Sequence, residues 1–162
     1  MPAPVSTRDL FAELYVAGLL ADAGWHLYFP KRDYGFDFIA TKAVRGSIVI
    51  RPVQVKGLYP TASKKSKGVY GYSGRLTQLH SDMVLAMPFF PTTREPSPLF
   101  TAFLPFCQAR PRGTKPGQYY AFPASFRDGA PVMRRNFRRF FDATGLQLME
   151  TEDFTNAQPE NG

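Results

Sequence analysis

The sequence has very few of the side chains that form disulfides or bind zinc. Its 162 residues include one cysteine, Cys107, and two histidines, His26 and His80. A single cysteine excludes an internal disulfide framework and is typical of a reducing compartment. Together with two histidines, it is also too small a set for a structural zinc site of the usual kind.

Long apolar runs are missing as well. No stretch approaches the ~20 uninterrupted apolar residues that a membrane-spanning helix needs. The most apolar stretch near the start, residues 10–23, is interrupted by Glu13 and Asp22 and has only Arg8 ahead of it. A secretory signal is therefore not expected, and the sequence predicts a soluble, cytoplasmic protein without a membrane partner.

Aromatic side chains are plentiful. Hydrophobic residues make up 44% of the chain, and it has 15 Phe and 8 Tyr. This composition excludes a mainly disordered chain, and the length suits one domain that can bury a core of its own. We expect a single domain over residues 1–149, followed by a disordered acidic tail over residues 150–162.

Positive charge is concentrated in one segment. The whole chain carries +7, whereas residues 31–75 hold ten Lys and Arg against two Asp, a net +8. Clustered cations gain free energy by releasing the counterions condensed on phosphates, so this segment indicates a surface for a polyanion. The alternative, about equally weighted on charge alone, is a basic loop that only contacts solvent.

The order of predicted elements indicates an α/β fold. Residues 8–23 have helical apolar spacing and end at Gly24. Residues 25–29, 36–44, 47–56, 83–90 and 99–106 have the composition of strands. Residues 57–74 are expected to be a mobile connection, residues 76–80 a short helix, and residues 132–143 an amphipathic helix capped by Gly145. The predicted architecture is a central mixed β-sheet flanked by helices.

The second and third strands form a predicted hairpin around Arg45-Gly46. A two-residue loop makes positions that face each other sum to 91, which puts Asp37 opposite Gln54. Side chains alternate along a strand, so Lys56 shares the face of Gln54 and Asp37. Pro52 lacks an N–H group, so it could mark an edge strand or a bulge that shifts this register. Taken as a single pair, Asp37 and Lys56 would favour a structural salt bridge near the strand ends over a catalytic site.

Glu13 lies on the first predicted helix beside Leu10, Ala17 and Leu20, at the border of its apolar stripe. If that stripe packs on the sheet, Glu13 comes close to the Asp37 end of the hairpin. The alternative is an exposed side chain or a partner for Arg8.

These residues resemble a known pattern. A helical Glu, then Gly35-Phe36-Asp37, then Gln54-Val55-Lys56 is similar to the PD-(D/E)XK nuclease superfamily, and nearest to Holliday-junction-resolvase-like bacterial nuclease domains. The resemblance covers residues 6–57, about a third of the chain. It implies a restriction-endonuclease-like core.

The resemblance also implies a role for each residue. Asp37 would be the central metal-binding carboxylate, Glu13 would contribute from the helix, and Gln54 would offer its side-chain carbonyl. Lys56 would orient or help to deprotonate the attacking water. The expected cofactor is Mg²⁺ or Mn²⁺, which prefer hard oxygen ligands. Gln54 departs from the commoner Glu or Asp and adds no negative charge, which weakens the expected metal affinity.

The expected function is hydrolysis of DNA phosphodiester bonds by a metal-dependent nuclease. Its nucleic-acid contacts are predicted in the basic segment, at Lys31, Arg32, Lys64, Lys65, Lys67 and Arg75. Two other functions stay open. One is a non-catalytic nucleic-acid-binding domain on the same scaffold, and the other is a protein-interaction module. A homodimer is a further open possibility.

Overall fold

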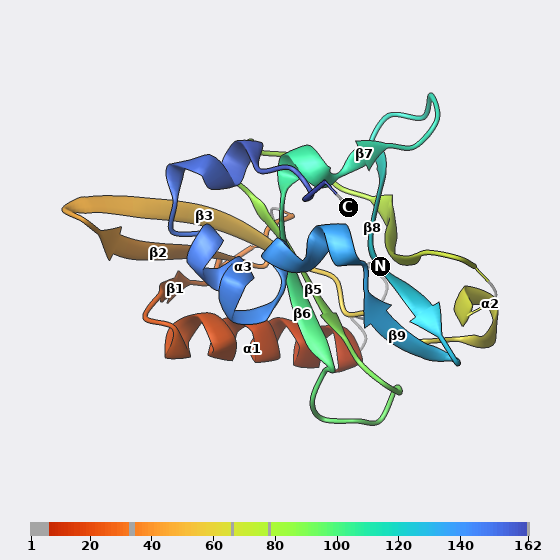
Figure 1. The fold of residues 1–162 in the computed structure, drawn as a ribbon. Helices are drawn as coiled ribbons and strands as arrows, with labels where there is room; N and C mark the ends of the chain where they lie inside the picture. Colours follow the sequence, from red (N-terminus) through yellow and green to blue (C-terminus); the bar gives the residue numbers. More distant parts are fainter. Residues whose placement is uncertain (1–6, 33–34, 66, 78, 162) are drawn as a thin grey trace.

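The computed structural model describes residues 7–32, 35–65, 67–77 and 79–161. It is an α/β protein with a five-stranded mixed sheet and a second, smaller sheet (Figure 1), as the sequence predicted for the class and the central sheet. The helices are α1 (Thr7–Asp22), α2 (Ala62–Lys65) and α3 (Asp142–Leu148), with 3₁₀ turns η1 (Phe106–Gln108), η2 (Arg135–Phe140) and η3 (Glu152–Asn156). The five-stranded sheet contains β1 (His26–Tyr28), β2 (Phe38–Val44), β3 (Ser47–Val55), β5 (Val84–Phe89) and β6 (Phe100–Pro105). The second sheet contains β4 (Tyr70–Arg75), β7 (Arg110–Pro111), β8 (Gln118–Arg127) and β9 (Ala130–Met133).

The first helix packs on one face of the five-stranded sheet. Its buried side chains are Ala12, Val16, Ala17 and Leu20, at helical spacing. Leu10 was expected in the apolar stripe but is 50% exposed, because the helix turns Ala12 and Val16 toward the sheet instead. The helix ends where Gly24 adopts a positive φ of 91°, as the sequence predicted. In the described part of the chain, no helix combines the length and apolar character needed to cross a membrane.

The hairpin between β2 and β3 has the predicted register. Val44 pairs with Ser47, and the ladder continues to Phe38 opposite Val53. Arg45 and Gly46 both have positive φ values, 49° and 82°, which is the conformation of the tight turns that match strand twist. The ladder ends there, and beyond it the Asp37 N–H donates to Val53 O at 2.9 Å, which keeps Asp37 beside this end of β3.

The β3 strand lies inside the sheet although it contains Pro52. Its parallel pairing with β5 begins at Val53, and the Lys56 N–H donates to Ala86 O on that side at 2.9 Å. By alternation, the nitrogen of Pro52 faces the same side, one residue before the pairing starts. The missing N–H group therefore breaks no ladder bond, and no bulge shifts the hairpin.

Two apolar clusters lie on opposite faces of the central sheet. One holds α1 against side chains such as Val53, Val55 and Ala86. The other holds the second sheet against Leu85 and Met87 of β5, together with β6. The molecule therefore has a helix on one face of β5 and a sheet on the other (Figure 1).

Four expectations about the rest of the chain were wrong. Strand β4 begins inside residues 57–74, expected to be an irregular connection, and residues 76, 77, 79 and 80 are not helical. The helix expected over residues 132–143 is instead the end of β9, then η2, then the start of α3. Gly145 lies inside α3, where a Cβ atom would meet Phe140 O at 2.2 Å, so it is required by close packing rather than as a cap.

The expected disordered tail also packs against the molecule. Phe154 in η3 is fully buried, and Arg51 of β3 donates to Met149 O at 3.0 Å and to Thr151 O at 2.9 Å. The Arg51 guanidinium also lies 4.8 Å from the centre of the Phe154 ring. The acidic composition suggested solvent exposure, but the chain around η3 brings one aromatic ring and two backbone carbonyls to a buried arginine.

Candidate functional site

Glu13 and Asp37 meet at the end of the hairpin where β2 begins. Glu13 lies on α1 and is half-buried, and a hydrogen bond joins its side chain to that of Asp37. The two residues are 24 positions apart and come from different elements. Helix α1 therefore brings Glu13 beside Asp37.

A close approach of backbone and helix makes this contact possible. Gly57 follows β3, and a Cβ atom at Gly57 would lie 2.9 Å from the Ala12 Cβ atom of α1. Such a distance is shorter than real side chains permit, so the small residues at positions 12 and 57 allow α1 to lie against this end of β3. Glu13 follows Ala12 and Lys56 precedes Gly57, which brings both side chains to the same end of the sheet.

Asp37 is held by the sheet itself. Its backbone N–H donates to Val53 O at 2.9 Å, and its Oδ2 accepts from the Val55 N–H at 2.6 Å. Strand β2 starts only at Phe38, so the carboxylate bonds an N–H group that lies beyond the ladder. A short, charge-assisted bond of this kind fixes the carboxylate at one position.

The surroundings of Glu13 favour its protonated form. Burial is the largest cause, followed by the negative charge of Asp37, their hydrogen bond and the charge of Asp9, and together they raise the pKa of Glu13 to about 7. The positive charge of Lys56 acts in the opposite direction. Two carboxylates lie close together in a partly buried place, and near neutral pH their negative charges repel each other. A bound cation would reduce this repulsion.

Gln54 and Lys56 lie on the face of β3 opposite α1. They alternate with Val53 and Val55, which pack toward α1, and Gln54 is only 3% exposed. The Lys56 ammonium lies 5.0 Å from the centre of the Tyr72 ring, on β4 of the second sheet. Lys56 is therefore half-buried against an aromatic ring, and its charge acts on Glu13.

The possible metal ligands are two carboxylates and one amide. Within the described residues, no group of three or more His, Cys, Asp and Glu side chains is placed to hold a metal ion. A cation here would be held by Glu13 and Asp37, with the Gln54 carbonyl oxygen as the neutral third donor. This oxygen-only set fits Mg²⁺, which takes one or two carboxylates and keeps several waters.

The basic residues predicted to bind nucleic acid lie on several different elements. Lys31 and Arg32 are exposed after β1, Lys65 is exposed on α2, and Arg75 is exposed at the end of β4. Lys64 and Lys67 line a common cavity beside β4. Two further cations of the basic segment serve the fold: Arg51 is buried, and Lys42 pairs with Glu150 and donates to Ala23 O at 2.8 Å.

Three residues in that cavity were missed by the sequence analysis. Arg112 and the β8 residues Tyr120 and Phe122 line it together with Lys64 and Lys67. The basic composition of residues 110–117 and the alternation of aromatic side chains over residues 118–122 were the signals available. Neither indicates which strand would lie beside which, so the cavity appears only in the tertiary structure.

The raised pKa of Glu13 predicts how stability depends on pH in the metal-free protein. The folded state binds the Glu13 proton more tightly than the unfolded chain, whose pKa is near 4.5. This stabilisation is complete below about pH 4.5 and is lost as the pH rises through about 7. In EDTA, we expect Glu13→Gln, whose side chain stays neutral, to have a higher melting temperature than the wild type at pH 8. At pH 4 we expect the two melting temperatures to be close.

Thermal melting by circular dichroism between pH 4 and pH 8 would check this expectation. The matched control is Glu95→Gln, a substitution in the exposed loop between β5 and β6. A difference in melting temperature between Glu13→Gln and the wild type that stays constant from pH 4 to pH 8 would contradict it.

Comparison of the chain with protein-family models, with curated proteins and with solved structures finds no match in any of the three.

Proposed function

We propose that this protein is a metal-dependent nuclease of the PD-(D/E)XK type, with DNA as its substrate. The observation that carries the proposal is the contact between Glu13 on α1 and Asp37 at the start of β2, with Lys56 beside them at the end of β3. The hydrogen bond from the Asp37 N–H to Val53 O, which holds Asp37 beside β3, supports it further. These are the residue types, the order and the elements that the resemblance implies.

Each side chain has a task that suits its surroundings. Glu13 and Asp37 would hold a divalent cation, which would supply positive charge that polarises a phosphoryl oxygen. Asp37 keeps its position because the Val55 N–H fixes one carboxylate oxygen. The Lys56 ammonium orients the attacking water and offsets the charge that develops on the phosphate. Its contact with the Tyr72 ring holds that ammonium in place.

Cleavage of labelled linear, nicked and branched DNA tests the proposal directly. Each substrate is incubated with the wild-type protein and Mg²⁺, Mn²⁺ or EDTA, and the products are separated on a denaturing gel. We expect cleavage with either metal and none in EDTA. Cleavage that persists in EDTA would exclude this mechanism.

A non-catalytic nucleic-acid-binding domain on the same scaffold is the second candidate. The neutral amide of Gln54 favours it, because two carboxylates bind a divalent cation less tightly than three. Binding to DNA with no cleavage under any metal would support this candidate. Binding to DNA through phosphate contacts must weaken as the salt concentration rises. A protein-interaction module would show no such salt-dependent binding to DNA.

Gln54→Glu tests whether a cation binds at this site. The new carboxylate would be buried, so we expect the variant to melt below the wild type in EDTA. Mg²⁺ should raise the melting temperature of Gln54→Glu more than that of the wild type, because three carboxylates bind the cation more tightly. The control is Gln147→Glu, an exposed position on α3. Equal responses to Mg²⁺ in wild type and Gln54→Glu would argue against a cation at this site.

The proposed setting is the cytoplasm, which the single cysteine favours. A homodimer stays a prediction for sedimentation analysis. The outer face of the β1–β3 sheet exposes apolar side chains that a second copy could cover, among them Tyr28, Ile48 and Ile50.

A further inference from the structure

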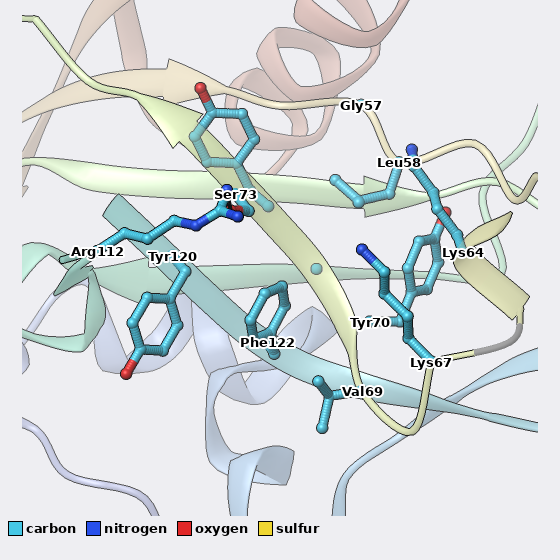
Figure 2. A pocket seen from close by; sticks show the side chains of 12 residues that line it. Gly57, Leu58, Lys64, Lys67, Val69, Tyr70, Ser73, Arg112, Tyr120 and Phe122 are labelled. Atoms are coloured by element: carbon cyan, nitrogen blue, oxygen red, sulfur yellow. Dashed lines mark hydrogen bonds between the residues drawn. The ribbon is translucent and has the colours of Figure 1, made fainter. Parts of the chain in front are cut away.

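A cavity of about 720 Å³ opens between the end of β3 and the second sheet. Figure 2 shows Arg112 and Tyr120 on one side of it, Lys64 and Lys67 on the other, and Phe122 between them. No acidic side chain is among the described residues that line it. Its volume lies within the range of ~300–1,000 Å³ typical of small-ligand sites, and its wall combines cations with aromatic rings.

The aromatic part of the wall suits a flat ring. Tyr120 and Phe122 alternate on β8, so their side chains leave the same face of the strand. Their ring centres are 5.4 Å apart and the planes differ by 24°, a stacked pair. Tyr120 is 36% exposed, which leaves part of its ring accessible from the cavity side. Nucleobases stack on such surface rings whatever their sequence.

The cationic part suits an anion. The Arg112 guanidinium is oriented by a 2.9 Å hydrogen bond from Nη1 to Ser73 Oγ. Lys64 donates to Tyr59 O at 3.3 Å, and partial burial lowers the pKa of its ammonium. Lys67 is exposed on the same side. Three cations around an aromatic wall match a phosphate attached to a nucleoside.

Tyr70 provides an independent sign that a polar ligand is missing. It lines the cavity and is only 2% exposed, and its buried hydroxyl has no hydrogen-bond partner among the described residues. A buried hydroxyl without a partner is unfavourable, because it has lost its hydrogen bonds to water. A polar group of a bound molecule would satisfy it.

The cavity is continuous with the candidate catalytic site. Gly57 lines the cavity and directly follows Lys56 in the chain. Tyr72 also lines it, and the centre of its ring is 5.0 Å from the Lys56 ammonium. A nucleotide in the cavity would therefore lie next to a phosphate held at Lys56.

We propose that this cavity binds an unpaired nucleotide of the nucleic-acid substrate, with the base on the Tyr120–Phe122 pair and phosphate contacts from Lys67 and Arg112. In a continuous duplex the faces of the bases are already stacked, so they are not available to Tyr120. The substrate is therefore a strand with at least one unpaired nucleotide beside the bond to be cut. Only this last statement rests on the proposed nuclease function.

Binding in EDTA tests the inference without any cleavage. The probes are a fluorescent single-stranded dT oligonucleotide and a duplex of equal length, and fluorescence anisotropy gives both affinities. Tyr120→Leu keeps an apolar side chain and removes the ring, so we expect it to weaken single-strand binding by about tenfold or more. We expect its duplex binding to be unchanged. The control is Tyr28→Leu on β1, a 60% exposed tyrosine outside the cavity.

A base analogue reports the contact directly. Fluorescence of 2-aminopurine in the single strand should fall on binding to the wild type and fall much less with Tyr120→Leu. Circular dichroism checks that the variant is folded. Equal loss of single-strand and duplex affinity, or no loss of either, would overturn the inference. If the wild type cleaves DNA but Tyr120→Leu binds single strands normally, the inference is overturned and the nuclease proposal stands. If the wild type does not cleave DNA but Tyr120→Leu loses single-strand binding, the inference stands and the nuclease proposal fails.

Discussion

Asp37→Asn is expected to abolish metal-dependent DNA cleavage while leaving binding to DNA largely intact. The change removes the negative charge that holds the cation at the proposed site. It does not remove the lysines and arginines that attract phosphates, and one carboxylate fewer on a basic protein does not weaken that attraction. The measurement is cleavage with Mg²⁺ or Mn²⁺ together with binding in EDTA.

Asn is the right replacement because Asp37 also supports the sheet. Its Oδ2 accepts the Val55 N–H, and the amide oxygen of Asn can accept the same bond. Asp37→Ala would leave this N–H group without that partner and confuse lost activity with lost structure. Asp22→Asn, at the exposed end of α1, is the matched control for loss of one carboxylate. Undiminished cleavage by Asp37→Asn would end the proposed mechanism.

Lys56→Met is expected to lower the cleavage rate by roughly 10²-fold or more, the usual contribution of a group that takes part in proton transfer. Met keeps an unbranched apolar side chain that can lie against Tyr72 but carries no ammonium. The loss should therefore come from charge and not from packing. Lys65→Met, an exposed lysine on α2, controls for the general loss of a positive charge.

A second measurement distinguishes a role at the site from a role in binding. The charge of Lys56 lowers the pKa of Glu13, so its removal should raise that pKa further. Because the raised pKa stabilises the folded state at low pH, the loss of stability should extend to higher pH in Lys56→Met than in the wild type. If Lys56→Met and the wild type lose stability over the same pH range in EDTA, Lys56 does not act on Glu13.

The local features of the candidate site could be predicted from the sequence. Helical spacing over residues 8–23 predicted α1, and the Arg45-Gly46 turn predicted the register that runs from Val44 opposite Ser47 to Phe38 opposite Val53. Both depend on interactions between residues close in the chain: a helix repeats every 3.6 residues, and a two-residue turn fixes every pair of a hairpin. The order of Glu13, Asp37, Gln54 and Lys56 then followed from these elements.

The second sheet could not be predicted in the same way. Strand β4 pairs with β8, so Tyr70 lies opposite Ala124, 54 residues further along the chain. Residues 57–74 are rich in Lys, Ser and Gly, and residues 118–131 contain Pro123 and Pro131, so neither segment has a clear strand pattern. Their pairing is stabilised by burial against β5 and β6, which depends on the whole fold.

The charged residues of the proposed nucleic-acid surface show the same difference between local features and long-range contacts. The sequence by itself determined which residues carry charge and which share a face of the hairpin, because those properties follow from residue type and local geometry. Only the tertiary structure decided that Arg51 is buried beneath η3, that Lys42 pairs with Glu150, and that Lys64 and Lys67 face Arg112 across a cavity. These outcomes depend on contacts between residues far apart in the chain, which form only when both faces of the central sheet are covered.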